Sequence, residues 1–303
     1  MQLGLGTAQF GLNYGLTNRR GRIAGEEAAK VLEVAAECGI GLLDTAPSYG
    51  EAEHIIGEAL RSGLRFRVII KTATFGPENP AEPNGGMLRE TFLRSLGNLG
   101  LKRVDGLLLH HSSDALVPGG RALVDELQAL KSEGLVERIG VSIYGAGDLE
   151  AILEMFTPDI VQLPLSVLDQ RLVQSGHLAR LHHMGVEIHA RSVFLQGALL
   201  AAPADLPEFL APLRDKLEAL HSLMRATGFS LLEGALAFIA QHREVSAAIV
   251  GVTGRNELLQ IAAAAMAANS IKLDFRSFAE QDDALLNPVR WTTAPEHATG
   301  VIQ

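Results

Sequence analysis

Three successive apolar runs of the sequence end in a charged or titratable side chain, and a tyrosine follows the first of them. The run "GIGLLD" (39–44) ends in Asp44, "RFRVIIK" (65–71) in Lys71 and "VDGLLLH" (104–110) in His110, and Tyr49 follows Asp44 closely. A phenol with a pKa of about 10 donates a proton poorly at neutral pH, but an adjacent ammonium would lower that pKa and a buried carboxylate would keep the ammonium charged. A neutral histidine could orient a carbonyl oxygen or share its proton. Together these residue types suit protonation of a carbonyl oxygen while hydride reaches the carbon.

Each of these residues alone also has a purely structural explanation. Asp44 could cap the following helix or turn, Lys71 could be a solvated strand end, and His110 could be a hydrogen-bonded core histidine. Acyl transfer is not indicated, because the sequence contains no G-x-S-x-G nucleophile elbow. The chemical interpretation therefore depends on a fold that brings the ends of three consecutive strands together.

The distribution of apolar residues predicts such a fold. Amphipathic helical segments such as "GEEAAKVLEVAAECG", and "GGRALVDELQALKSEGLV" ending near Gly134, separate short apolar runs, which indicates parallel βαβ units with strands buried on both faces. The eight runs lie at 3–8, 39–44, 65–71, 104–110, 137–142, 159–163, 186–192 and 247–251. No G-x-G-x-x-G turn follows the first run, so we expect a closed (β/α)8 TIM barrel rather than an open doubly wound sheet. One domain should span 1–303, with a tail from about Ser270 packed on the barrel.

The active site of such a barrel lies at the carboxyl ends of the strands. Polar side chains also end later runs, namely Ser142, Gln162 and Ser192. The loop 74–86, rich in Pro, Gly and Asn, joins a strand to its helix. We expect all these polar side chains to converge on one rim.

Composition limits the class of protein. At 303 residues, 47% hydrophobic and 20% charged, the chain can bury a large core, and its net charge of −9 argues against nucleic acid or an anionic membrane as a partner. The first residues show no charged leader, and no apolar stretch approaches the ~20 residues of a membrane span, so we expect a cytoplasmic protein. The single cysteine, Cys38, excludes a disulfide within one chain and is expected to be a buried thiol.

At the residues named above, the sequence resembles the aldo-keto reductase family. "LLDTAPSYG" is similar to its Asp-to-Tyr segment, "VIIKT" to its lysine strand and "VDGLLLHHS" to its histidine strand, and the likeness runs from "LGLGTAQFG" to "IVGVTGRNELLQ". The resemblance implies hydride transfer from NADPH or NADH, with neither metal nor flavin, to a small-molecule carbonyl. It makes Tyr49 the general acid, Asp44 and Lys71 the residues that tune it, and His110 the residue that orients the carbonyl. The implied cofactor-binding residues are Thr7, Asp44, Ser142, Gln162, Arg191, Ser192, Gly197, Gly251, Thr253, Arg255 and Glu257.

Three positions depart from the pattern of the family. Ile143 replaces an asparagine that often contacts the nicotinamide carboxamide. Arg191 stands where an aromatic ring often stacks on the nicotinamide; its charge would favour the reduced cofactor, or it could pair with cofactor phosphates or an acidic side chain. Glu257 stands where an arginine is frequent, so a 2′-phosphate would meet a carboxylate and only Arg255 remains to bind it. We therefore expect NADH or dual cofactor use.

The adjacent histidines and the substrate pocket leave alternatives open. Successive strand residues point to opposite sides, so only His110 should face the barrel mouth, while His111 lies in a pocket-shaping loop or is exposed, and the diverging pair does not suit a metal. Tyr14, Phe10 and Trp291, with Phe75 and Phe194, could line the pocket or belong to the core. The leading prediction is a carbonyl reductase or, in reverse, an alcohol dehydrogenase. The alternative is a cofactor-binding regulatory or redox-sensing subunit with little turnover.

Overall fold

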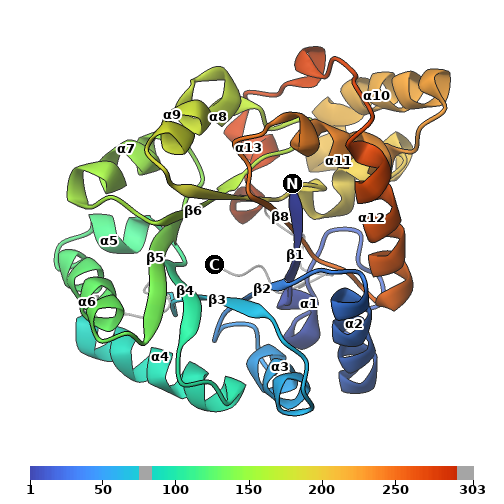
Figure 1. Cartoon of the computed structure of the whole chain (residues 1–303). Coiled ribbons are helices and arrows are strands. Elements are labelled where there is room, and N and C mark those ends of the chain that lie inside the picture. The colour runs from blue at the N-terminus through green and yellow to red at the C-terminus, as the bar shows by residue number, and fades with distance from the viewer. Residues whose placement is uncertain (75–83, 292–303) are drawn as a thin grey trace.

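Eight parallel strands close into a barrel in the computed structural model of the chain, which describes residues 1–74 and 84–291 (Figure 1). Each strand pairs with its neighbours in sequence, and β8 pairs with β1, so the order around the barrel is that of the chain. The strands are β1 (Gln2–Gly6), β2 (Leu42–Thr45), β3 (Arg67–Lys71), β4 (Val104–Leu109), β5 (Val136–Ser142), β6 (Ile160–Pro164), β7 (Glu187–Arg191) and β8 (Ala247–Val250). The predicted (β/α)8 architecture is confirmed.

The strand ends differ in detail from the predicted runs, because short apolar runs also include the turn residues that flank a strand. Lys71 and Ser142 end their strands and Asp44 lies one residue before the end of β2. His110 and Ser192 instead follow β4 and β7 by one residue, and Gln162 lies in the middle of β6. All of them still lie at the carboxyl side of the barrel.

The helices form a ring around the barrel (Figure 1). They are α1 (Ala8–Gly11), α2 (Gly25–Glu37), α3 (Ala52–Arg61), α4 (Gly85–Leu99), α5 (Ser113–Leu116), α6 (Arg121–Ser132), α7 (Ala146–Met155), α8 (Arg171–Gln174), α9 (His177–His183), α10 (Arg214–Thr227), α11 (Leu231–Gln241), α12 (Arg255–Ala268) and α13 (Asp283–Leu286). Short 3-10 turns are η1 (Leu195–Leu200), η2 (Pro203–Asp205), η3 (Glu208–Leu213), η4 (Arg276–Phe278) and η5 (Pro288–Arg290). The apolar stripe of α2 is buried as its spacing predicts.

The prediction that Cys38 is buried is wrong. Cys38 is exposed at the C-terminal end of α2. The helix ends there and the chain turns away through Gly39, whose φ of 73° is left-handed, so the side chain does not follow the buried stripe into the core.

The two ends of the barrel interior differ in chemistry. Its middle is filled by an apolar layer consisting of Leu42, Ile69, Leu108, Ile160, Ala247 and Ile249. At the amino ends of the strands, Glu187 pairs with Arg67, Arg138 and His189. Burial opposes the charge of Glu187, but these three partners outweigh it and lower the pKa of Glu187 to about 2. Among the described residues, ion pairs and the apolar layer fill the amino side of the barrel interior, and the polar groups that could act on a ligand lie at the carboxyl side.

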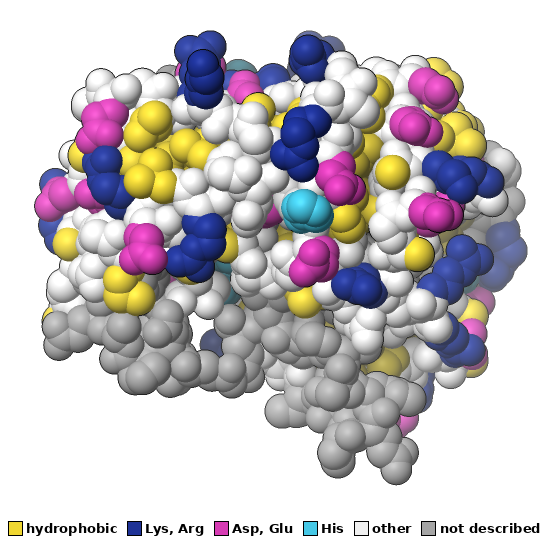
Figure 2. All heavy atoms as spheres, turned by 90° about the horizontal axis from the view of Figure 1, so that it is seen from below, with side chains coloured by type: hydrophobic (Ala, Val, Ile, Leu, Met, Phe, Trp, Pro, Cys, Tyr) yellow, Lys and Arg dark blue, Asp and Glu magenta, His cyan; other side chains and the backbone are white. Residues whose placement is uncertain are grey.

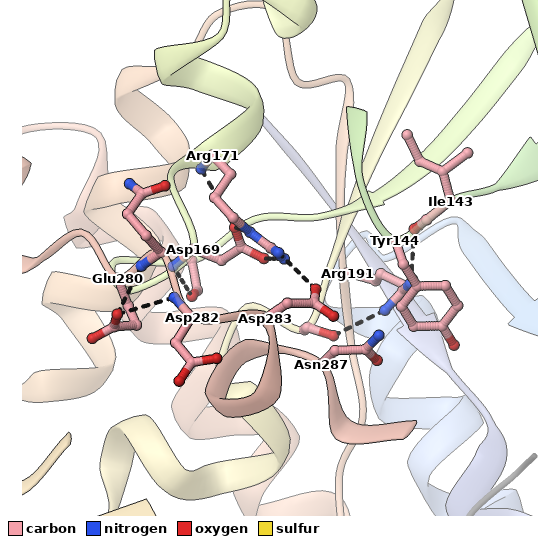
Figure 3. Close-up of polar contacts among 12 residues, drawn as sticks. Ile143, Tyr144, Asp169, Arg171, Arg191, Glu280, Asp282, Asp283 and Asn287 are labelled. Carbon is pink, nitrogen blue, oxygen red and sulfur yellow. Dashed lines mark hydrogen bonds and ion pairs between the residues drawn. The ribbon is translucent and has the colours of Figure 1, made fainter. Parts of the chain in front are cut away.

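The segment after α12 packs against α8, α10 and the loop before α8. The Glu280 N–H donates to the Leu168 carbonyl at 2.8 Å, Arg171 pairs with Asp283 at 2.7 Å, and Lys216 pairs with Glu280 at 2.8 Å. Figure 3 shows the Arg171 side chain reaching Asp283 of α13. Phe75, the loop residues 75–83 and residues 292–303 of the predicted tail lie outside the described residues.

The described helices and the charges on one face of the molecule can be compared with the composition. No single helix there is long and apolar enough to cross a membrane; the pair Glu208–Thr227 and Leu231–Gln241 passes the length and composition test jointly but is bent by 94°. On the face shown in Figure 2, acidic and basic side chains are interspersed rather than gathered into a field of one sign.

Candidate active site

A buried chain of hydrogen bonds joins the four polar groups at the barrel mouth. Lys71 Nζ donates to Asp44 Oδ1 at 2.5 Å and to the Tyr49 hydroxyl at 3.0 Å. Gln162 Nε2 donates to the second carboxylate oxygen, Asp44 Oδ2, at 2.8 Å. All four side chains are at most 6% exposed. The predicted convergence of Asp44, Tyr49 and Lys71 is therefore present in the structure, and Gln162 extends it from β6.

The electrostatics of this chain favour a protonated tyrosine beside a charged lysine. Burial opposes the charge of Lys71, but Asp44 and Tyr49 outweigh burial, so the pKa of Lys71 stands above its ordinary value. Burial raises the pKa of Tyr49 above 10, against the lowering effect of Lys71. The lysine acts in the predicted direction, but desolvation of the phenol is the larger effect. Tyr49 thus holds its proton at neutral pH, with a cation in place to stabilise the phenolate it would leave.

The two adjacent histidines lie side by side rather than diverging. Their rings are stacked, with centroids 4.8 Å apart and planes within 5° of parallel. The prediction that they point to opposite sides is wrong, because β4 ends at Leu109 and strand alternation does not extend to them. His110 lies edge-on to Tyr49 at 5.9 Å, and His111 stacks on Tyr144 at 6.0 Å.

Both histidines are neutral at physiological pH. Burial, with the charge of Lys71 next in size, holds the pKa of His110 well below its usual range. Burial and the charge of Arg191 lower the pKa of His111 to about 4. His110 can therefore offer a neutral hydrogen bond to a carbonyl oxygen, as the sequence predicts.

A cavity of about 530 Å³ opens beside this chain. An adjoining pocket of about 80 Å³ also reaches Tyr49, Lys71 and His110. The predicted residues that line one or both are Thr7, Tyr14, Asp44, Tyr49, Lys71, His110, Ser142, Gln162, Arg191, Ser192, Phe194, Gly197, Gly251, Thr253 and Glu257. Since the polar groups that could act on a ligand lie at this side of the barrel, this opening is the natural entry for a ligand.

Unusual backbone conformations are concentrated on one wall of the cavity. The three non-glycine residues with positive φ in the described chain are Ser192, Leu195 and Gln196, and Gly197 follows at φ 93°. A Cβ at Gly197 would lie 2.0 Å from Thr17 Oγ1, so glycine is needed where the loop after α1 crosses this wall. Strained backbone of this kind is typical of ligand-binding segments.

The polar groups at the mouth fit a nicotinamide carboxamide. Gln162 Oε1 is buried and has no hydrogen-bond partner among the described residues, whereas its amide nitrogen donates to Asp44. A buried orphan acceptor is costly unless a ligand donates to it. Ser142 lies beside it, because β5 and β6 pair Ser142 with Gln162 in register. Both residues line the 80 Å³ pocket.

Two carboxylates occupy the N-terminus of α12, the predicted site of the adenosine phosphate. Glu257 Oε2 accepts from Thr253 N at 2.6 Å and from Thr253 Oγ1 at 2.9 Å. Glu27 Oε1, from α2, accepts from Arg255 N at 3.0 Å. The favourable interaction of a helix N-terminus with an anion is thus already satisfied by the protein itself.

The guanidinium of Arg191, which stands where an aromatic ring is frequent in the family, is held by three contacts within the protein. Its Nη2 donates to the Ile143 carbonyl at 2.8 Å and its Nη1 to Ser192 Oγ at 3.2 Å. The guanidinium carbon lies 4.2 Å from the centroid of the Tyr144 ring (Figure 3). The sequence allowed an acidic partner for Arg191, and no described residue provides one.

Four predicted site residues do not line either cavity. Phe10 and Trp291 are buried in the core, where Trp291 packs on Phe209 with ring centroids 5.6 Å apart. His111 is stacked between two rings, and the exposed Arg255 lies outside the lining. Aromatic type alone is a weak signal for a pocket, because core packing uses the same residues.

The sequence reasoning missed Tyr144, Glu27, Gln196, Pro288 and Val289. Tyr144 and Gln196, with Pro288 and Val289 of η5, line the smaller pocket. Tyr144 could have been found, since it follows the strand that ends in Ser142, and the chain has only three tyrosines. All three line the same pocket. The others depend on contacts between distant segments and leave no local signal.

Comparison with known proteins agrees with this geometry. Residues 2–284 match the model of the "Aldo/keto reductase family". An NADH-specific methylglyoxal reductase of Escherichia coli (strain K12) is 30% identical over 185 residues, covering 54% of this chain and 56% of that protein. L-galactose dehydrogenase of Arabidopsis thaliana is 25% identical over 287 residues, covering 91% and 89%. The holo form of an aldo-keto reductase from Bacillus halodurans shares the fold, with a TM-score of 0.72, 21% identity and coverage of 96% and 95%.

These likenesses differ in extent. The match spans little more than half the length of the methylglyoxal reductase, whereas it spans most of the dehydrogenase. At 21% identity the solved structure is evidence of fold only.

Proposed function

Because the chain belongs to the aldo/keto reductase family, we propose that it is an NAD(P)H-dependent reductase of aldehydes or ketones that can also run the reverse oxidation of an alcohol. The observation that carries the proposal is the buried hydrogen-bond chain from Asp44 through Lys71 to the protonated Tyr49 hydroxyl, at the edge of a large cavity. A reduced nicotinamide dinucleotide, when bound, supplies the hydride for the carbonyl carbon.

The residues of the chain handle the proton. The Tyr49 O–H bond breaks as its proton passes to the carbonyl oxygen, which becomes the hydroxyl of the product alcohol. Lys71 stabilises the phenolate that remains, and Asp44 keeps Lys71 charged and in place. His110, being neutral, orients the carbonyl oxygen without adding a charge. We assign Ser142 and Gln162 to the nicotinamide carboxamide, on the basis of the orphan Gln162 oxygen.

Replacing the phenol tests this assignment. Tyr49→Phe should lower kcat for an aldehyde about 1,000-fold, the scale of a lost general acid, with little change in the Kd of the dinucleotide. Tyr144→Phe is the matched comparison, since it removes a hydroxyl from the same pocket without touching Lys71, and it should cost less than about tenfold. Full turnover by Tyr49→Phe would refute the role. Dinucleotide binding without any turnover of aldehydes in the unmodified protein would favour a regulatory subunit.

We further propose that the cofactor is NADH, or NADH in preference to NADPH. Glu27 and Glu257 surround the N-terminus of α12, where a 2′-phosphate would meet two negative charges. The relative named an NADH-specific methylglyoxal reductase is consistent with this choice.

Binding of the two dinucleotides decides the preference. Calorimetry should show NADH binding at least about tenfold tighter than NADPH, and the double variant Glu27→Gln/Glu257→Gln should narrow that ratio, because it removes both charges and keeps the side-chain size. Tenfold tighter binding of NADPH would overturn the proposal. Residence in the cytoplasm, and the absence of nucleic acid and membrane as partners, stay predictions from composition.

A further inference from the structure

Arg191 is the one half-buried arginine of the described chain without an ion pair. Six arginines are half-buried: Arg67, Arg89, Arg138, Arg171, Arg191 and Arg214. The other five each pair with at least one carboxylate. A partly desolvated cation without a counter-charge is costly, so a protein that keeps one beside a cavity has a use for an anion there.

The small pocket has a net positive charge because of this residue. Its charged lining consists of Lys71 and Arg191, and Asp44 neutralises the first of them. The guanidinium is fixed in place by the Ile143 carbonyl and by the Tyr144 ring. Two of the five N–H groups of the guanidinium donate to the Ile143 carbonyl and to Ser192 Oγ, and the remaining three can donate to a carboxylate.

The direction of the side chain argues for the substrate rather than for the cofactor phosphates. Arg191 ends β7, and its guanidinium crosses the end of β6 to reach the backbone after β5. Arg191 also lines the larger cavity, but the wall with Gly251, Thr253 and Glu257 is formed by the loop after β8 and the first turn of α12, on the other side of β7. Arg191 lowers the pKa of His111, which follows β4, and so acts electrostatically on the histidine side of the mouth.

Given the reductase function proposed above, we propose that Arg191 binds an anionic group of the substrate, so that the preferred substrates are short carbonyl compounds bearing a carboxylate. The pocket of about 80 Å³ is small, which favours short compounds. Pro288 and Val289 of η5 are the apolar side chains of the pocket lining. The Tyr144 ring stacks on the guanidinium and is expected to hold Arg191 in position, so we class Tyr144 as a positioning residue.

Matched pairs of aldehydes test the inference. We would compare 4-oxobutanoate with butanal and glyoxylate with glycolaldehyde, because each pair differs chiefly in the carboxylate. The unmodified protein should show a kcat/KM at least about tenfold higher for one or both acids than for the neutral partner. Arg191→Met should lower kcat/KM for the preferred acid about 100-fold, mainly through a higher KM. It should change kcat/KM for the neutral aldehyde less than about threefold. Arg191→Lys should recover part of the loss, and Arg243→Met is the control for removal of an exposed arginine.

The outcomes separate the substrate from the cofactor and from the proposed function. Equal kcat/KM for acid and neutral aldehydes in the unmodified protein, or an equal loss for both in Arg191→Met, would overturn the inference while leaving the reductase in place. A Kd for NADH that weakens about 100-fold in Arg191→Met would show that the anion is a cofactor phosphate.

If the protein turns over no aldehyde, a binding measurement still tests the anion site. Calorimetry should then show 4-hydroxybutanoate binding at least about tenfold tighter than 1,4-butanediol, with the difference lost in Arg191→Met. Equal binding of the two would overturn the anion site even where the proposed function had already failed.

Discussion

The Tyr49 hydroxyl is a phenol whose burial outweighs the cation beside it. Because its pKa lies above 10, it is protonated throughout the neutral range and ready to donate. In the proposed mechanism, reduction needs the protonated phenol, and oxidation of an alcohol needs the phenolate. The same pKa should therefore favour reduction at neutral pH and oxidation at alkaline pH.

The pH profile is the first prediction at this scale. For reduction, kcat/KM should show no decline due to Tyr49 below about pH 10 and should fall above it, as the phenol loses its proton. Lys71→Met should move that decline to still higher pH, since the lysine is the group that lowers the pKa, and should reduce the maximum rate about 100-fold. Initial rates from pH 6 to 11 measure both. A decline centred below pH 9 would contradict the assignment.

Sequence reasoning predicted the identity of these residues better than their electrostatics. Asp44 and Lys71 are polar residues in apolar strands, a pattern visible in one dimension. The pKa of Tyr49 depends on how deeply several loops bury it, which no local pattern records. The stacking of His110 on His111 was missed because it depends on a single residue, the position at which β4 ends.

The segment 192–197, which forms one wall of the cavity, contains the non-glycine residues with positive φ in the described chain. Gly197 has φ 93° and meets Thr17 across the cavity edge, whereas Gly185 has a similar φ of 76° with open space around it. Comparing the two separates the cost of the backbone angle from that of the contact.

Substitution of each glycine by alanine gives the second prediction. Gly185→Ala should cost about 1 kcal/mol, the penalty of a left-handed backbone angle for alanine. Gly197→Ala should cost about 1–3 kcal/mol more, because Thr17 must move, and should weaken dinucleotide binding. Denaturant unfolding and calorimetry measure the two effects. An equal loss of stability at both positions would show that the Thr17 side chain moves aside without a free-energy cost.

The ion pairs at the amino ends of the strands give the third prediction. Glu187 has a pKa of about 2 in the folded protein, below its ordinary value, so it binds its proton more weakly folded than unfolded. The stabilisation is therefore fully present above pH 4.5 and is lost as pH falls toward 2. Glu187→Gln should cost about 3 kcal/mol at pH 7 and much less at pH 2.5. Urea unfolding at both pH values measures this, and a cost independent of pH would contradict it.

The sequence predicts the number and the order of the strands well, but it predicts the residues at which they end less well. The alternation of apolar runs and amphipathic segments predicts eight strands, because a buried parallel strand must be apolar on both faces. Cys38 and the ends of β4 and β7 were misjudged because a turn residue beside an apolar run looks the same as a strand residue.

At the scale of the whole molecule, we propose that barrel and C-terminal segment form one domain. Hydrogen bonds and ion pairs from Glu280 and Asp283 reach α8, α10 and the loop before α8. Trp291, the only tryptophan of the chain, is 6% exposed and packs on Phe209 of η3. The segment also lines the pocket of about 80 Å³ through Pro288 and Val289, so under the proposed function its docking bears on activity as well as on stability.

The position of Trp291 makes this testable without any engineering. Its fluorescence reports the docking of the segment, whereas far-UV circular dichroism reports the helices and strands of the barrel. If they form one cooperative unit, both signals should change at the same urea concentration, as two-state unfolding requires. Arg171→Met, which removes the pair with Asp283, should then shift both midpoints together. A tryptophan transition that precedes the loss of dichroism would instead show a segment that undocks from an intact barrel, and the pocket of about 80 Å³ would then lose Pro288 and Val289 from its lining.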